Sequence, residues 1–222
     1  MEYKYRKKDF CFMRKGIVAC ASMIFGLILL FVAFLGPWYT INGSGALGVN
    51  YNVGFYLTKM EAKGTIPGQD ISLSMSYTDV KENAQMVGVN IESFAVINTA
   101  MYLTLCAIIT ALIAVIGIIA FIFNKGKPKT MKWLGGGFWF LTFFLALVPA
   151  LYVMSTGFAE NSNGFWFSQS VLGVTVSGGP GYAWYLMMVV AIISVISAVA
   201  ILLKKIAPEA TSPETLPPAT NK

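Results

Sequence analysis

The side chains that most often carry out chemistry in proteins are scarce in this chain of 222 residues. It contains no histidine, and histidine is the commonest general base and a usual ligand of zinc and haem. Its cysteines, Cys11, Cys20 and Cys106, are too scattered to form a metal-binding pair. Its serines have neither a histidine nor a buried lysine to activate them. The sequence therefore predicts a protein that is not an enzyme, with no catalytic residue, no metal site and no cofactor.

Two side chains are candidates for covalent modification. Cys11 lies in a basic, aromatic segment beside the first apolar run, where a thiol can be acylated. A free thiol at the membrane interface is the plainer interpretation. Asn42 begins an Asn-Gly-Ser pattern, which is an acceptor for N-glycosylation. It follows the first apolar run by only a few residues, which limits the access of a modifying enzyme.

Four long apolar runs contain no Asp, Glu, Lys, Arg or His. They cover residues 16–36, 94–123, 133–154 and 182–203. A helix needs about 20 apolar residues to cross a hydrocarbon core about 30 Å thick, and each run is long enough. The sequence therefore predicts an all-α membrane protein with a bundle of four transmembrane helices.

The basic residues are distributed unevenly around these runs. Segments 1–15, 124–132 and 204–222 hold 13 of the 16 Lys and Arg residues but four of the ten acidic residues. Because Lys and Arg near the ends of spans are retained in the cytoplasm, these three segments are predicted to be a cytoplasmic arm, turn and tail. Loop 1 (37–93) and loop 2 (155–181) are then extracellular. We expect a plasma-membrane protein with both termini in the cytoplasm and a disordered tail rich in Pro, Thr, Ser and Glu.

The basic character of the chain does not indicate nucleic-acid binding. The net charge is +6 and the pI is about 9.2, but the chain is 56% hydrophobic and its basic residues lie next to the apolar runs. There they are placed to meet anionic lipid head groups, with about 1 kcal/mol of attraction for each one near the surface. The lipid bilayer is therefore the predicted partner of these residues.

Alternating residues in the loops predict β-strands. Apolar residues alternate with serines over Gln69–Tyr77, and Val49–Leu57 repeats the pattern less regularly. Turn-forming residues in Lys63–Gly68 would let these two strands pair antiparallel. Ser170–Ser177 in loop 2 is also strand-like. We expect a small extracellular antiparallel sheet of about three to five strands from both loops, and Val80–Ser93 is predicted to be a short helix leading into the second span.

Small residues recur at helical spacing within the predicted spans. They are Ser22, Gly26, Ala107, Ala111, Ala114, Ala191, Ser194 and Ala198. Such stripes let helices approach closely in a bilayer, so we expect a compact bundle. A seam between subunits is the alternative use of these stripes. The charged residues that normally mark a transport path are absent from the spans, so a path within one chain is not expected.

Aromatic residues fall into two groups. Those at predicted span ends are expected to be membrane-interface anchors, and they include Trp38, Tyr39, Trp133, Tyr182 and Trp184. Phe165, Trp166 and Phe167 lie in the middle of loop 2, and three consecutive aromatic residues cannot all face one small core. At least one is therefore expected to be exposed, as a contact for another protein or as an insertion among lipid head groups. The strand residues Tyr51, Tyr56 and Tyr77 are further candidate partner contacts.

This layout resembles the claudin-like tetraspan superfamily, which includes claudins, the peripheral myelin protein family and the gamma subunits of calcium channels. Pro37-Trp38 at the end of the first span is similar to the Pro-x-Trp found there, and Gly181-Tyr182-Ala183-Trp184 is similar to the Tyr-Gly-Trp that opens the fourth span in several relatives. The family's Gly-Leu-Trp motif and spaced cysteine pair are missing from loop 1, and the tail does not end in a hydrophobic ligand. The resemblance therefore implies an architecture rather than junction formation.

These observations favour a non-enzymatic tetraspan membrane protein that acts in protein–protein interaction or assembly at the cell surface through its extracellular loops. The partner would be another membrane or surface protein, or another copy in a homo-oligomer. Two alternatives remain at this point: an accessory subunit of a larger membrane complex, including a membrane enzyme, and a small oligomeric channel or transporter.

Overall fold

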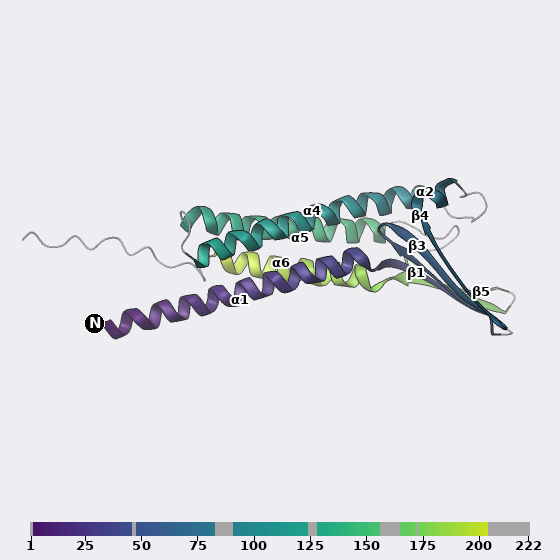
Figure 1. The fold of residues 1–222 in the computed structure, drawn as a ribbon, viewed down its shortest axis with the longest axis horizontal. Helices are drawn as coiled ribbons and strands as arrows, with labels where there is room; N and C mark the ends of the chain where they lie inside the picture. Colours follow the sequence, from purple (N-terminus) through teal and green to yellow (C-terminus); the bar gives the residue numbers. More distant parts are fainter. Residues whose placement is uncertain are drawn as a thin grey trace, which may run out of the picture.

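The chain folds into a long helical bundle that continues at one end into a β-sheet (Figure 1). The computed structural model describes residues 2–45, 48–82, 91–123, 128–155, 165–171 and 173–203. The sheet lies at the end of the bundle opposite the N-terminus (Figure 1).

The bundle contains four long helices, each of which includes a stretch long and apolar enough to cross a membrane. They are α1 (Glu2–Leu35), α4 (Ile91–Ile122), α5 (Pro128–Met154) and α6 (Tyr182–Leu202). This confirms the prediction of a four-helix, multi-pass membrane protein at the level of length and composition. Helix α1 begins at Glu2 rather than at residue 16, because the preceding segment is rich in good helix formers and has no Pro or Gly to stop the helix.

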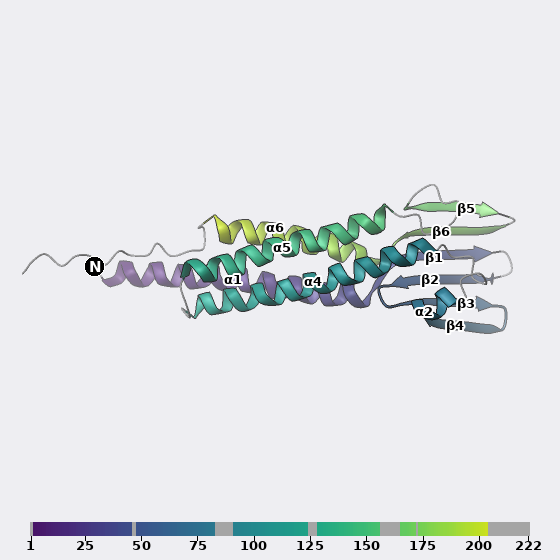
Figure 2. The ribbon, with the colours of Figure 1, turned by 90° about the horizontal axis from the view of Figure 1, so that it is seen from above.

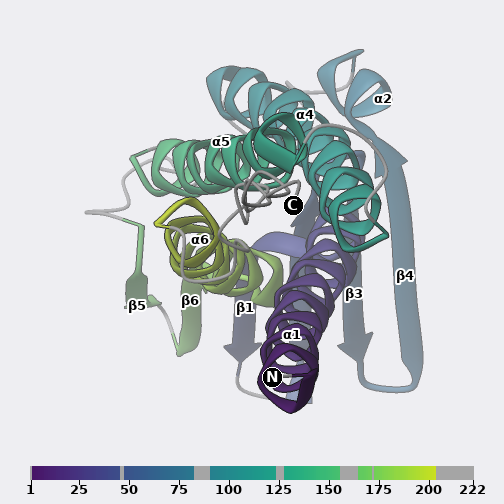
Figure 3. The ribbon, with the colours of Figure 1, turned by 90° about the vertical axis from the view of Figure 1, so that its left-hand side faces the viewer.

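The four helices form a closed ring in the order α1, α4, α5, α6, and each contacts both of its neighbours (Figure 3). Small residues lie where the helices meet, as expected. Ala107, Ala111 and Ala114 are fully buried, and a Cβ built on Gly117 in α4 would lie 2.9 Å from the backbone nitrogen of Gly135 in α5. Close contact of backbones at small residues is a typical way to pack helices in a bilayer.

Several hydroxyl groups in the bundle are paired, whereas the buried hydroxyl of Ser194 in α6 has no hydrogen-bond partner among the described residues. The hydroxyls of Thr110 in α4 and Thr142 in α5 are 3.1 Å apart, and those of Ser22 and Ser197 link α1 and α6 at 3.1 Å. Thr104 donates to the carbonyl of Ala100 in its own helix. These bonds satisfy polar groups that would be costly to leave unpaired in an apolar interior.

The sheet is antiparallel and has six strands. They are β1 (Pro37–Gly45), β2 (Asn50–Tyr56), β3 (Lys59–Ile66), β4 (Gln69–Ser76), β5 (Phe167–Val171) and β6 (Val174–Pro180). Their order across the sheet is β4-β3-β2-β1-β6-β5, so both predicted loops contribute (Figure 2). The prediction of one antiparallel sheet from both loops is confirmed, although the strands are more numerous than expected.

Several predicted boundaries within the sheet were wrong. Strand β3 separates β2 from β4, so these two strands do not pair directly. The turn is shorter than Lys63–Gly68 and is centred on Pro67 and Gly68, where the positive φ of Gly68 (84°) suits glycine. Ser170–Ser177 is not one strand but a hairpin, which turns at Gly173 with a φ of 79°.

The helix predicted over Val80–Ser93 begins earlier, as α2 (Tyr77–Glu82). Ser76 precedes it and its hydroxyl lies 2.6 Å from the Asp79 carboxylate, while the Asp79 N–H donates to the Ser76 hydroxyl. This reciprocal pairing is a capping arrangement that fixes the start of the helix. The remainder of the predicted helix, up to Ile91 where α4 begins, lies outside the described residues.

Two of the connections between the sheet and the bundle are very short. Strand β1 begins two residues after α1 ends, and β6 is separated from α6 by Gly181 alone. The Gly181 N–H donates to the carbonyl of Trp38 at 3.0 Å, so the two connections are also hydrogen-bonded to each other. The orientation of the sheet is therefore fixed relative to the helices.

Candidate binding surface on the sheet

The strand register divides the sheet into an apolar face and a polar face, because alternate residues of a strand point to opposite sides. One row across all six strands is Leu73, Ala62, Val53, Ile41, Gly178 and Phe167. The adjacent row, on the other face, is Ser72, Lys63, Asn52, Asn42, Ser177 and Ser168. The two faces therefore offer different chemistry to a partner.

The apolar face is covered near the bundle and open farther away. Tyr39, Phe55 and Met60 are buried in adjacent strands, and the Tyr39 ring lies 5.3 Å from that of Phe165 between ring centroids. At the far edge, on β4, Ile71 and Leu73 are 45% and 50% exposed. An exposed apolar pair at a sheet edge is a candidate protein contact.

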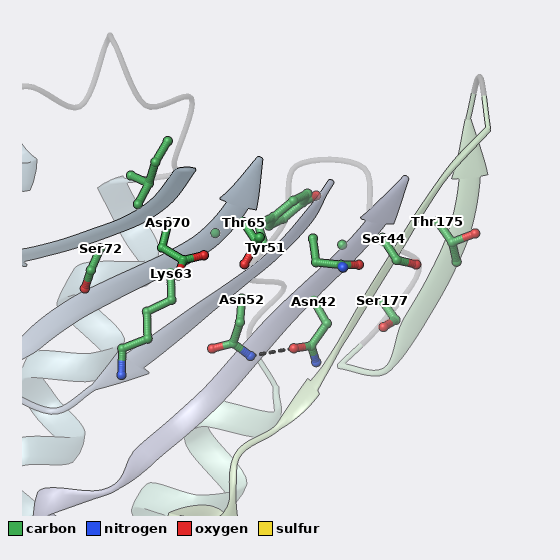
Figure 4. A pocket seen from close by; sticks show the side chains of 14 residues that line it. Asn42, Ser44, Tyr51, Asn52, Lys63, Thr65, Asp70, Ser72, Thr175 and Ser177 are labelled. Carbon is green, nitrogen blue, oxygen red and sulfur yellow. Dashed lines mark hydrogen bonds between the residues drawn. The ribbon is translucent and has the colours of Figure 1, made fainter. Parts of the chain in front are cut away.

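The polar face carries an open groove of about 700 Å³ (Figure 4). Its polar side chains come from five strands: Asn42, Ser44, Asn50, Asn52, Lys63, Thr65, Asp70, Ser72, Thr175 and Ser177. The side-chain amide of Asn52 donates to the side-chain oxygen of Asn42, so two neighbouring amides are held in fixed orientation (Figure 4). Hydroxyls and amides both donate and accept hydrogen bonds, which suits a polar, uncharged ligand.

Two aromatic rings lie on the polar face between the groove and the bundle. A Cβ built on Gly179 would lie 3.1 Å from Cδ1 of Trp166, and one built on Gly54 would lie 3.0 Å from Cε2 of Tyr56. Each ring therefore covers a glycine. Both glycines pair with Thr40, so the rings flank that residue in one row of the sheet.

Charged residues beside Tyr56 form a small network. Glu61 pairs with Lys59 at 2.6 Å and with Lys63 at 3.7 Å. The hydrogen bond from Lys59 holds the pKa of Glu61 below its usual value and raises the pKa of Lys59 itself. Partial burial, together with the Glu61 carboxylate, raises the pKa of Tyr56. With two lysines and one glutamate, the network carries a net charge of +1.

The predicted partner-contact residues differ in how far their side chains are exposed. In loop 2, Phe165 is buried, Phe167 is half-buried on the apolar face, and Trp166 is 53% exposed. The prediction that at least one of three consecutive aromatic residues is exposed is confirmed for Trp166. Its ring lies 4.9 Å from that of Phe165 and 6.2 Å from that of Trp184, so this exposed indole is firmly supported.

The three candidate tyrosines of loop 1 also lie in different environments. Tyr51 lies on the apolar face, where its ring covers Gly43. Tyr77 is half-buried and its hydroxyl donates to the backbone carbonyl of Tyr56, and burial raises its pKa. Of the six candidates, Trp166 and Tyr56 are therefore the pair that the fold brings to the polar face.

The predicted membrane-interface anchors differ in exposure. Trp133 and Tyr182 are exposed, but Trp38, Tyr39 and Trp184 are buried. The indole of Trp38 donates to the carbonyl of Ala33 at 2.9 Å, and that of Trp184 donates to Ala150 at 2.8 Å. Three of the five predicted membrane-interface anchors therefore pack inside the protein, where the sheet meets the bundle.

The remaining predicted sites are placed as follows. Asn42, the candidate glycosylation acceptor, is an exposed residue of β1 and lines the groove. Cys11 falls within α1, and its side chain lies outside the described residues. No group of three or more metal-binding side chains occurs among the described residues.

The polar face of the sheet was not predicted from the sequence. The pattern that indicates it is present in β1, where Thr40, Asn42 and Ser44 alternate with Tyr39 and Ile41.

No protein-family model matches the chain, and no curated protein matches it.

Proposed function

We propose that this protein is a non-enzymatic plasma-membrane tetraspan that holds its sheet outside the cell and binds another membrane or surface protein there, or a second copy of itself. The observation that carries this proposal is the exposed apolar pair Ile71 and Leu73 on β4. Large apolar side chains grouped at an exposed sheet edge are typical of interaction sites.

The charge distribution supports the outward placement of the sheet. The start of α1, with its basic residues, and the start of α5, which includes Lys129 and Lys132, lie at one end of the bundle, and the sheet lies at the other end (Figure 1). Because clusters of Lys and Arg are retained in the cytoplasm, the sheet is expected on the outer side.

The edge position of β4 supports a protein as the partner. Strand β4 is the last strand in the sheet order, so its outer backbone groups face away from β3. A second strand can pair with such an edge through main-chain hydrogen bonds while apolar side chains pack beside it. Ile71 and Leu73 lie on one face of β4 and supply that packing. The rigid junction with the bundle would then hold the partner at a fixed orientation above the membrane.

The experiment is purification of the full-length protein from its native membrane in a mild detergent, followed by mass measurement of the intact complex. We expect a stoichiometric protein partner or a defined homo-oligomer, and loss of that complex in a double variant with Ile71→Ser and Leu73→Ser. Ser72→Ala is the matched control, because this residue lies on the opposite face of the same strand. A monomeric wild-type protein, or an unchanged complex in the double variant, would contradict the proposal.

A further inference from the structure

The polar face of the sheet has a composition that simple exposure to water does not explain. Its two rows farthest from the bundle contain 12 residues, of which Lys63 and Asp70 are the charged ones and the other ten are Ser, Thr or Asn. Solvent-facing positions are usually rich in Lys, Glu, Arg and Asp. Here short neutral side chains fill the groove, and the two opposite charges cancel.

This composition restricts the class of ligand. Phosphate, sulfate and nucleic acids are usually held by clusters of Arg and Lys, and the groove offers Lys63 with Asp70 nearby. An apolar ligand would leave the remaining hydrogen-bonding groups of Asn42 and Asn52 unpaired, at a cost in free energy. A ligand rich in neutral hydroxyl groups satisfies both donors and acceptors. Ser, Thr and Asn also have few rotatable bonds, so little side-chain entropy is lost when they become ordered.

The aromatic rings add a second recognition element. Trp166 and Tyr56 cover glycines of β6 and β2, which are both neighbours of β1. Neighbouring strands are about 4.8 Å apart, so the two glycines lie roughly 10 Å apart across the sheet. Ser177 lies in the groove two residues before Gly179 and on the same face, which places the indole at the bundle end of the groove. Both rings offer apolar surface beside the polar groove.

We propose that the polar face binds a neutral glycan, with sugar rings resting on Trp166 and Tyr56 and sugar hydroxyls bonded to Asn42, Asn52 and the neighbouring serines and threonines. Sugar rings carry C–H groups on their faces and hydroxyls around their edges, which matches aromatic platforms beside amides and hydroxyls. This site lies on the opposite face of the sheet from Ile71 and Leu73. Glycan binding at this site and the proposed protein association both require the sheet to lie outside the cell, and they share no other requirement.

The test is direct binding by the full-length protein in lipid nanodiscs prepared without glycolipids and without alkyl-glycoside detergents, whose sugars would compete. The probes are neutral oligosaccharides of glucose, mannose, galactose and N-acetylglucosamine, each six sugars long, with a sulfated oligosaccharide as the charged comparison. We expect at least one neutral oligosaccharide to bind, with a change in tryptophan fluorescence, and the sulfated one to bind more weakly.

The variants assign the binding to the polar face. Trp166→Ala should raise the Kd about tenfold or more, because the exposed aromatic platform is lost, whereas Trp166→Phe should keep most of the affinity. Asn52→Ala should also weaken binding. Leu73→Ser is the control on the apolar face and should leave the Kd for the oligosaccharide unchanged even if it abolishes protein association. Failure of glycan binding and failure of protein association can therefore be distinguished. Absence of binding by every neutral probe, preference for the sulfated probe, or an unchanged Kd in Trp166→Ala would overturn the inference.

Discussion

Gly181 approaches Pro37 so closely that a Cβ on Gly181 would lie 2.1 Å from the carbonyl oxygen of Pro37. The first residue joins β6 to α6 and the second begins β1 directly after α1. Two connections from distant parts of the sequence therefore touch at a point with no room for a side chain. This contact holds the sheet in one orientation relative to the helices of the bundle.

The first prediction concerns this junction. Gly181→Ala should destabilise the protein by about 1–3 kcal/mol, because the new methyl group must displace backbone atoms rather than a flexible side chain. Thermal unfolding in detergent measures the effect. Gly137→Ala is the matched control, since a Cβ there meets its nearest neighbour at an ordinary 3.8 Å. Equal unfolding temperatures for the two variants would show that the junction tolerates a side chain.

The second prediction concerns the buried tryptophans at the same end of the bundle. Trp184→Phe removes the hydrogen bond to the Ala150 carbonyl and part of a buried ring. We expect a loss of about 1–2 kcal/mol in the free energy of unfolding. Trp133→Phe makes the same chemical change at an exposed position and should have little effect. If both variants unfold like the wild type, Trp184 does not link α5 and α6 as described.

The third prediction concerns pH. The pKa of Glu61 is lower in the folded protein because Lys59 donates a hydrogen bond to its carboxylate. Its contribution to stability is therefore complete above the ordinary carboxyl pKa of about 4.3 and disappears as the pH falls through the lower folded value. The unfolding temperature of the wild type should exceed that of Glu61→Gln at pH 7, by a small amount because both side chains remain partly accessible to water, and the difference should vanish at pH 2. A constant difference across this range would show that the carboxylate charge is not responsible.

The spans were predictable because a long, uninterrupted apolar run has few possible structures other than a transmembrane helix. The small residues of α4 also indicated close packing. Strand β3 was missed although Lys59, Glu61 and Lys63 alternate with Met60 and Ala62, because the small Ala62 and Gly64 weaken its apolar stripe. Its place in the sheet depends on pairing with β2 and β4 rather than on its own pattern.

The buried tryptophans show a different limit. Trp38 and Trp184 lie at span ends, where tryptophan usually faces the membrane interface. Their burial depends on partners such as Ala33 and Ala150, and sequence position alone does not reveal that the sheet covers this end of the bundle.

The candidate site was partly predictable. Three consecutive aromatic residues required an exposed one, and Trp166 is exposed. The polar face was missed because Asn42, Lys63 and Ser177 come from distant parts of the sequence and share a row only when the register of all six strands is known.

Both proposals depend on the sheet lying outside the cell, which single-cysteine labelling tests most directly. In a chain with Cys11, Cys20 and Cys106 replaced by serine, Ser74→Cys places a thiol on the exposed strand β4, and Thr130→Cys places one at the start of α5. A membrane-impermeant maleimide applied to intact cells should label the cysteine at position 74, and should label the one at position 130 only after permeabilisation. Labelling of position 130 but not position 74 in intact cells would contradict the account.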